Sequence, residues 1–389
     1  MDTKAWFGIL LIATGILAML FPHLTSGATM PVSFFIVMLG MVFAFPSLLQ
    51  GYDKLSQRIA KPASSAGNSP LPVAGSDVAA EAIRAKGKEW VESFPFVTGI
   101  SVRNKTADGK DVGAVALVFK VTHKTDPGEY GMIPHYLNYI SQSGERYRLL
   151  TDVVKEDLPQ AKAAVSVPIK ENKAPFPLGN SISRRNGLTG SIGLVVQQSG
   201  DSTGDFIVSC YHVFCSPELQ KNNKSFDKGD ASAELSCASS GDDGTNMVGV
   251  VVKGVMDGRN DFAVAKLARG IAVDNGQATL NHVPSSFGFV FPENVGDTVT
   301  MCGRSSGVNT GKIKSHSAAQ TISYFQGAVT NFFTGLIEVE PFSLGGDSGG
   351  VVVNEKNKVI GLVVAGSPDA SYVLPVQDFL ISNNFVLKT

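Results

Sequence analysis

The run Gly-Gly-Asp-Ser-Gly-Gly at positions 345–350 places a serine where the backbone can turn sharply. Glycine has no Cβ, so the main chain around Ser348 can crowd toward one point and direct its N–H groups there. The N–H groups of Gly346 and Ser348 are then placed to hold an oxyanion, usually the largest electrostatic term in acyl-transfer catalysis. A plain glycine-rich turn is the alternative, because the chain contains 41 glycines. The chemistry therefore depends on finding a base and an orienting acid.

Candidates for both residues lie upstream. His212 lies in a buried-strand pattern at 206–214, and Asp261 opens an apolar strand at 261–267. Taken singly, His212 could be a packed core histidine and Asp261 a cap at a strand edge. Together with Ser348, their order and rough spacing resemble the chymotrypsin-like serine proteases. The resemblance implies that Ser348 is the nucleophile, His212 the general base and then acid, and Asp261 the residue that orients His212.

A fourth segment resembles the bacterial branch of that family, which includes the α-lytic protease and streptogrisin types. Residues 301–311 contain Gly-Arg-Ser-Ser-Gly, similar to a Gly-Arg-Thr-Thr-Gly stretch whose arginine pairs with the aspartate before the nucleophile. By this resemblance Arg304 and Asp347 support the site, and no N-terminal cleavage is needed to assemble it. The alternative is that Arg304 lies on the surface in a Gly/Ser turn.

The substrate-binding side chains are read from the same resemblance. Phe342 stands six residues before Ser348, where trypsin has the acid that selects Lys and Arg. Val364, Ala365 and Gly366 lie in a run similar to the strand that pairs with the substrate backbone. Without an acid at the base of the pocket, a small or apolar substrate side chain is expected.

Short Val- and Ile-rich runs broken by Gly, Asn, Asp and Ser predict an all-β architecture for this region. The resemblance implies a double-barrel catalytic domain over residues 177–389. The formal net charge of −1 and the lack of a long basic run argue against nucleic-acid binding. No metal or organic cofactor is expected, because the neighbouring base activates the nucleophile.

The N-terminal region predicts membrane insertion. No Asp, Glu, Lys or Arg occurs from Ala5 to Tyr52, and two apolar stretches, Trp6–Phe21 and Met30–Leu49, flank a turn. These lengths predict a transmembrane helical hairpin within residues 1–61. A buried soluble hairpin is one alternative, and a signal peptide cleaved near Ala28 with the second stretch as an anchor is another.

Basic residues predict the topology of this hairpin. Lys4 precedes the first stretch, Lys54, Arg58 and Lys61 follow the second, and the turn between them has none. The positive-inside rule then places both ends, with the catalytic region, on the cytoplasmic side of a bacterial inner membrane. The four cysteines suit a reducing compartment, although an even number could pair. Their spacing is not that of a zinc site.

Between the hairpin and the catalytic region, residues 62–75 have the composition of a flexible linker. Residues 76–170 predict a small α/β domain, whose role as docking, inhibitory or packing unit the sequence leaves open. Its expected elements are a helix at Val78–Phe94 capped by Ser76 or Asp77, a hairpin of Val97–Arg103 and Val112–His123, a short helix at Ile133–Ser141 and a strand at Tyr147–Val154.

These features predict a multidomain, membrane-anchored serine endopeptidase that acts on protein or peptide substrates. One rival is a non-catalytic membrane scaffold whose protease-like domain only binds extended peptides. Another is an effector whose hairpin disturbs the membrane when the protease triggers it.

Overall fold

The computed structural model describes residues 70–94, 96–107, 110–122, 133–161, 174–184, 188–215, 225–227, 237–240, 246–324 and 327–388. The chain divides into two compact units, Met1–Leu71 and Pro72–Thr389, and every element below belongs to the second. The expected hairpin at 1–61 lies outside the described residues. Among the residues that are described, no helix has the length and apolar character to cross a membrane.

The first half of the predicted catalytic region, together with β19 from the C-terminal end, forms a nine-stranded antiparallel sheet. Its strand order is β19-β7-β8-β12-β11-β10-β5-β6, with β9 paired to β11. The bounds are β5 Ser181–Arg184, β6 Thr189–Ser191, β7 Leu194–Gln198, β8 Asp201–Ser209, β9 Phe226–Asp227, β10 Cys237–Ser240, β11 Asn246–Met256, β12 Asp261–Leu267 and β19 Phe385–Leu387. Short helices are α5 Tyr211–Phe214, α7 Gln277–Leu280, η3 Pro292–Asn294 and α8 Gln377–Ser382.

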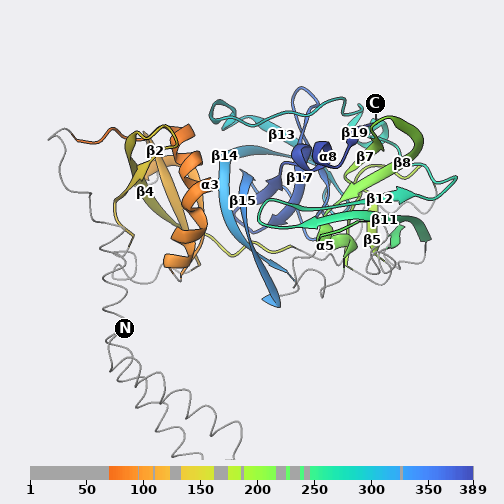
Figure 1. Cartoon of the computed structure of the whole chain (residues 1–389), viewed down its shortest axis with the longest axis horizontal. Helices are drawn as coiled ribbons and strands as arrows, with labels where there is room; N and C mark the ends of the chain where they lie inside the picture. Colours follow the sequence, from red (N-terminus) through yellow and green to blue (C-terminus); the bar gives the residue numbers. More distant parts are fainter. Residues whose placement is uncertain are drawn as a thin grey trace, which may run out of the picture. The chain divides into compact units, whose positions relative to one another are not determined.

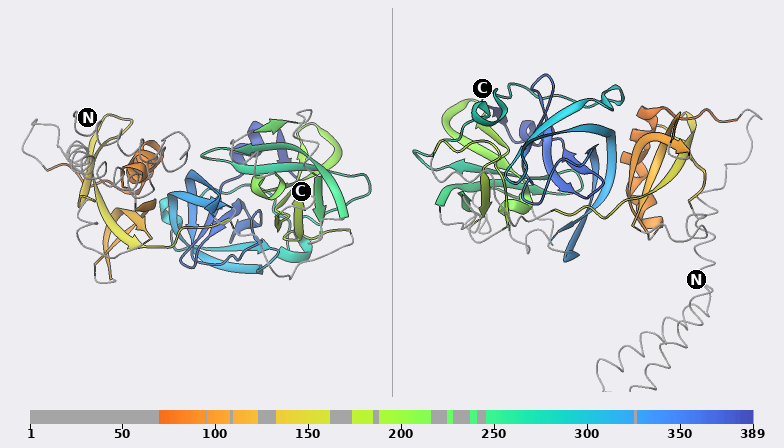
Figure 2. Two further views of the ribbon diagram at one scale, coloured as in Figure 1. Left: turned by 90° about the horizontal axis from the view of Figure 1, so that it is seen from below. Right: turned by 180° about the vertical axis from the view of Figure 1, so that it is seen from behind.

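The second half closes into a barrel. Its strands are β13 Thr298–Gly303, β14 Gly307–Tyr324, β15 Val329–Val339, β16 Val351–Asn354, β17 Val359–Gly366 and β18 Ser371–Leu374. They follow the order β13-β16-β17-β18-β15-β14, and β13 also pairs with β14, which completes the ring. Apolar side chains from both halves share one large buried cluster. The predicted all-β architecture of this region is confirmed, and Figure 2 shows both sheets from two directions.

The α/β segment continues the sheet of the second barrel. Its elements are α3 Ser76–Ser93, β1 Val97–Ala107, β2 Lys110–Val121, β3 Tyr136–Ile140 and β4 Arg146–Lys155. Strand β1 pairs antiparallel with β14, with Ile100 opposite Ala319, and the order continues through β2, β4 and β3. Helix α3 packs against β1 and β2 (Figure 1). The predicted helix, hairpin and last strand are therefore present, and their sheet is shared with the barrel. The expected helix cap is wrong: Ser76 and Asp77 lie inside α3, and the N-cap is Gly75, with no side-chain cap hydrogen bond.

Two further expectations are wrong, one in this segment and one in the expected linker before it. The run 133–141, expected as a helix, contains strand β3, which pairs antiparallel with β4. Leu137 and Tyr139 are buried there while Tyr136 and Ile140 are exposed, the alternation of a strand with one covered face. Short apolar runs fit both periods, and pairing with β4 decides between them.

The end of the expected linker is also ordered. The N–H of Ala74 donates to Arg148 O at 2.9 Å, and the N–H of Arg148 donates to Pro72 O at 2.8 Å. Residues 72–74 are thus held along β4 by hydrogen bonds, which the polar composition of 62–75 does not reveal.

Buried ion pairs join the α/β segment to the barrel. Lys120 on β2 places its Nζ 2.9 Å from Glu338 Oε2 on β15, and both side chains have 0% exposure. Arg103 pairs with Glu338 and, at 2.6 Å, with Glu156. Lys120 also lies 2.8 Å from the hydroxyl of Tyr372. Burial opposes ionisation of Glu338, but the charges of Lys120 and Arg103 outweigh it and lower the pKa of Glu338 to about 2.

Candidate active site

The histidine and the aspartate meet because β12 pairs with β8. Ala263 lies opposite Ser209, so Asp261 at the start of β12 faces α5, which follows β8. His212 Nδ1 lies 2.7 Å from Asp261 Oδ2, and the backbone N–H of His212 donates to Asp261 Oδ1 at 3.1 Å. Both side chains are buried. The carboxylate therefore fixes both the ring and the backbone of the histidine.

Tyr324 is a third member of this group that the sequence did not indicate. It ends β14, and its hydroxyl donates to Asp261 Oδ2 at 3.0 Å. Its ring meets the His212 ring edge to face, with centroids 5.2 Å apart. Burial and the nearby Asp261 charge raise the pKa of Tyr324, so the phenol remains a donor. Tyr324 is 63 positions from Asp261 with no local motif around it, so only the fold brings it here.

The serine loop is bonded to β6 and β17 and lies against the residues that precede His212. The N–H of Ser191 donates to Ser348 O at 2.8 Å, and the N–H of Gly349 donates to Val363 O at 2.7 Å. Gly349 has φ +88°, and a Cβ there would lie 2.2 Å from Ser209 Oγ and 3.2 Å from Cys210 N. Only glycine permits this approach. The loop therefore lies directly against residues 209–210, next to His212.

Ser348 itself is 4% exposed, and its Oγ lies 3.5 Å from the carbonyl oxygen of Val364. This long contact leaves the hydroxyl weakly held. Val364 thus takes part in the site through its main chain.

Two peptide groups of the serine loop are oriented by hydrogen bonds to their carbonyl oxygens, which directs their N–H groups to the opposite side. The carbonyl of Gly345 accepts from Ser305 Oγ at 2.6 Å, and that of Asp347 accepts from Gly350 N at 2.8 Å. In a trans peptide the following N–H points the opposite way, which here means the N–H groups of Gly346 and Ser348. Within the described part of the chain, no hydrogen bond uses either of these two N–H groups. Both are therefore available to an incoming oxygen.

Asp347 is held differently from the expectation. Its Oδ1 accepts from the N–H groups of Ser305 at 2.7 Å and Ser306 at 3.1 Å. Its Oδ2 accepts from Ser306 Oγ at 2.5 Å and Leu344 N at 2.7 Å. Across the residues that the structure describes, no ion pair joins Arg304 to Asp347. The predicted guanidinium partner is replaced by four hydrogen bonds to this carboxylate.

The reason lies in the turn that contains Arg304. A Cβ on Gly303 would lie 2.5 Å from Asp347 Oδ1, so the backbone itself reaches the carboxylate. Arg304 is buried, with 1% exposure, and its N–H donates to Ser191 Oγ at 2.9 Å. The same Ser191 Oγ donates to Gly346 O at 2.9 Å. The Gly-Arg-Ser-Ser turn therefore supports the serine loop, but through its main chain and serines.

The cavity beside Ser348 is very small. Its volume is about 10 Å³, and it is lined by Gln160, Ser343, Leu344, Ser348, Val363, Ala365 and Gly366. Ala365 and Gly366 are where the sequence placed them. Phe342 is not: it is 2% exposed and packs in the core with Val339 and Val373. The turn after Phe342 sends Ser343 and Leu344 to the cavity instead. The space holds roughly one water.

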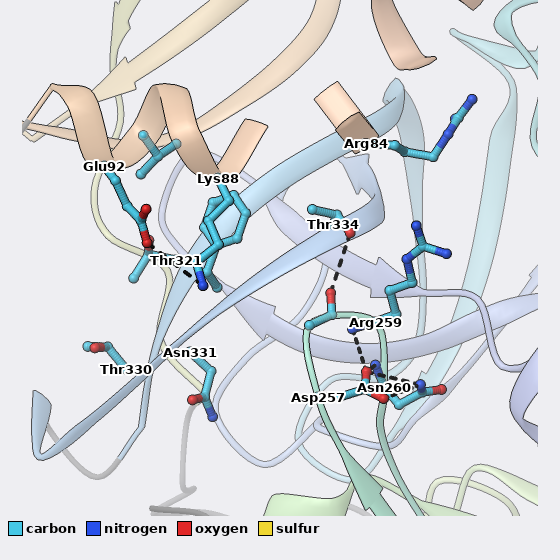
Figure 3. A pocket seen from close by; sticks show the side chains of 13 residues that line it. Arg84, Lys88, Glu92, Asp257, Arg259, Asn260, Thr321, Thr330, Asn331 and Thr334 are labelled. Carbon is cyan, nitrogen blue, oxygen red and sulfur yellow. Dashed lines mark hydrogen bonds and ion pairs between the residues drawn. The ribbon is translucent and has the colours of Figure 1, made fainter. Parts of the chain in front are cut away.

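The segment before Asp261 lines a second, larger hollow of about 810 Å³ (Figure 3). Hydrogen bonds hold this segment in place. Asp257 Oδ1 accepts from the N–H groups of Arg259 at 2.7 Å and Asn260 at 2.8 Å. The N–H of Thr334 on β15 donates to Gly258 O at 2.9 Å. These bonds fix the loop that leads into Asp261.

A metal is a poor occupant of the histidine group. Ligand atoms of Cys210, His212 and Asp261 lie within 4.8 Å of one another. However, His212 Nδ1 and Asp261 Oδ2 already bond each other, and burial raises the pKa of the Cys210 thiol, which disfavours thiolate. The side chains of Cys210, Cys215 and Cys302 are all buried.

Part of the chain is similar to known proteins. Residues 191–362 match the trypsin-like peptidase domain family. Among solved structures, Thermobifida fusca protease A is 19% identical with a TM-score of 0.40, covering 55% of this chain and 97% of its own. Nocardiopsis protease is 20% identical with a TM-score of 0.40, and the match covers 55% of this chain and 98% of the Nocardiopsis chain. The MamO protease domain from Magnetospirillum magneticum is 16% identical with a TM-score of 0.33, and the match covers 54% of this chain and 97% of the MamO domain. No curated protein matches the chain.

Proposed function

We propose that this chain is a serine endopeptidase whose trypsin-like peptidase domain hydrolyses peptide bonds through Ser348, His212 and Asp261. Ser348 Oγ attacks the carbonyl carbon, His212 takes its proton and later returns it to the leaving amine, and Asp261 holds His212 in the required tautomer. The N–H groups of Gly346 and Ser348 stabilise the oxyanion. The observation that carries the proposal is the pair of Asp261–His212 hydrogen bonds beside a serine loop with two uncommitted N–H groups.

The oxyanion loop is proposed to form without N-terminal processing. A buried carboxylate at Asp347 needs donors, and Ser305, Ser306 and Leu344 supply them from inside the chain. No new α-amino group is required for this purpose. The described residues that line the cavity beside Ser348 include no acidic side chain that would select lysine or arginine, so we infer a substrate residue with a small or apolar side chain.

The proposal is tested by incubating the full chain and its Ser348→Ala variant with a peptide library. We expect cleavage after small residues by the parent chain and none by the variant. Equal cleavage by both proteins would reject Ser348 as the nucleophile. Peptide binding without cleavage by the parent would favour the scaffold alternative.

We also propose that residues 1–61 anchor the enzyme in a membrane with both chain ends on the cytoplasmic side. The charge-free stretch from Ala5 to Tyr52 and the basic residues at its flanks support this. Single cysteines introduced by Thr25→Cys and Ser64→Cys should react with an impermeant maleimide from opposite sides of the membrane. Labelling of position 64 from outside intact cells would instead place the catalytic domain outside the cytoplasm.

A further inference from the structure

The end of β17 beside Ser348, beyond its pairing with β16, is already bridged by another segment of the chain. The N–H of Gln160 donates to Gly366 O at 3.1 Å, and the N–H of Gly366 donates to Gln160 O at 3.2 Å. The two residues form an antiparallel bridge. Gln160 also borders the cavity that Ser348 lines. The segment leading out of the α/β region therefore lies in the candidate active site.

Further bonds on both sides hold this segment in place. The N–H of Ser323 donates to Pro159 O at 3.0 Å, and the N–H of Ala161 donates to Ser323 O at 2.9 Å. Upstream, the N–H of Asp157 donates to Asp369 Oδ2 at 3.0 Å. Residues 157–161 are thus bound between the end of β14 and the end of β17.

We propose that residues 157–161 act as a built-in competitor that occupies the peptide-binding edge of β17 and restrains the enzyme until they are displaced. Gly366 has one N–H and one carbonyl, and Gln160 uses both. A substrate strand that adds to this edge needs the same two groups. The inference rests on the proposed function, because it assigns an inhibitory role to the segment at that same site.

Covalent attachment of residues 157–161 to the end of β4 makes this competition effective. The segment follows β4, and Glu156 at its start is 5% exposed and pairs with Arg103. Attachment to a fixed point gives the segment a high effective concentration at the edge, against which a free peptide must compete. The apparent affinity of a peptide then falls in proportion to the fraction of molecules with an open edge.

This arrangement also predicts which substrates are affected. A peptide long enough to reach Gly366 must displace Gln160, whereas an ester that carries a single amino acid needs only the surroundings of Ser348. The difference between long and short substrates is therefore the signature of the competitor.

The test compares Gln160→Pro with Gln160→Ala in the full chain. Both variants lose the side chain, but only proline loses the N–H that bonds Gly366 O. We expect kcat/KM for a tetrapeptide anilide ending in alanine to be about tenfold higher for Gln160→Pro than for Gln160→Ala, the scale of losing one or two backbone hydrogen bonds. Hydrolysis of an alanine ester should be equal in the two variants. Equal kcat/KM values for the tetrapeptide would overturn the proposal.

Two further measurements separate this inference from the proposed function. In a Ser348→Ala background, fluorescence anisotropy should show tighter binding of the labelled tetrapeptide to the Gln160→Pro chain than to Gln160→Ala. If that difference appears but no variant with Ser348 hydrolyses the ester, the proposed function fails and the occupied edge stands. If the proline variant does not fold, Asp369→Ala removes the Asp157 bond and should raise tetrapeptide binding instead; unchanged binding would count against the competitor.

Discussion

Asp261→Asn is expected to lower kcat by about 10⁴-fold while leaving the fold intact. Asp261 Oδ2 accepts from both His212 Nδ1 and the Tyr324 hydroxyl, and Oδ1 accepts from the His212 backbone. An amide has only one oxygen, so its NH₂ must face a donor or force the imidazole into the other tautomer. His212 would then present N–H rather than a lone pair to the serine. Steady-state kinetics, with circular dichroism to check the fold, measure this effect.

Tyr324→Phe is the matched control for that variant. It removes one neutral hydrogen bond to the same oxygen and keeps the ring on His212. The expected loss in kcat is only about tenfold, because the histidine keeps its carboxylate. If Asp261→Asn lost no more activity than Tyr324→Phe, Asp261 would not be the residue that orients His212.

Glu338→Gln is expected to reduce the free energy of unfolding by about 3–5 kcal/mol. The variant leaves the fully buried ammonium of Lys120 without its nearest carboxylate and also weakens the site of Arg103. Urea unfolding at neutral pH measures the loss. The double variant Lys120→Met with Glu338→Leu, which removes both charges, should recover much of it. A change below about 1 kcal/mol in the single variant would mean that the pair is solvated.

The same carboxylate gives a pH dependence of defined sign. The pKa of Glu338 is lowered from its ordinary 4.5 to about 2 in the folded chain. The stability it contributes is therefore fully present above pH about 4.5 and is lost as the pH falls toward 2. The Glu338→Gln variant should lack this component of the acid transition.

The sequence predicts those parts of the site that short motifs carry. Ser348 is recognisable from its glycines, and His212 and Asp261 from their strand ends and order. Tyr324, Ser305 and Ser306 could not be found in that way, because a long strand and a close turn bring them to their carboxylates only in the folded chain. Arg304 shows the converse: its motif marks the right turn, but the backbone rather than the guanidinium reaches Asp347.

The substrate pocket and the α/β segment were less predictable for similar reasons. Counting back from Ser348 selects Phe342, but a turn moves the cavity lining to Ser343 and Leu344. The short run around Leu137 fits helix and strand alike until β4 pairs with it. Nothing in the composition of residues 157–161 indicates that they bind along β17.

The proposed function requires Ser348 to be an activated nucleophile. Reaction of the full chain with a fluorophosphonate, followed by mass spectrometry of the digested protein, tests it most directly. We expect one phosphonylated residue, Ser348, with labelling lost in Ser348→Ala and strongly slowed in His212→Ala. No labelling of the folded parent chain, or a label on another serine that persists in Ser348→Ala, would contradict it.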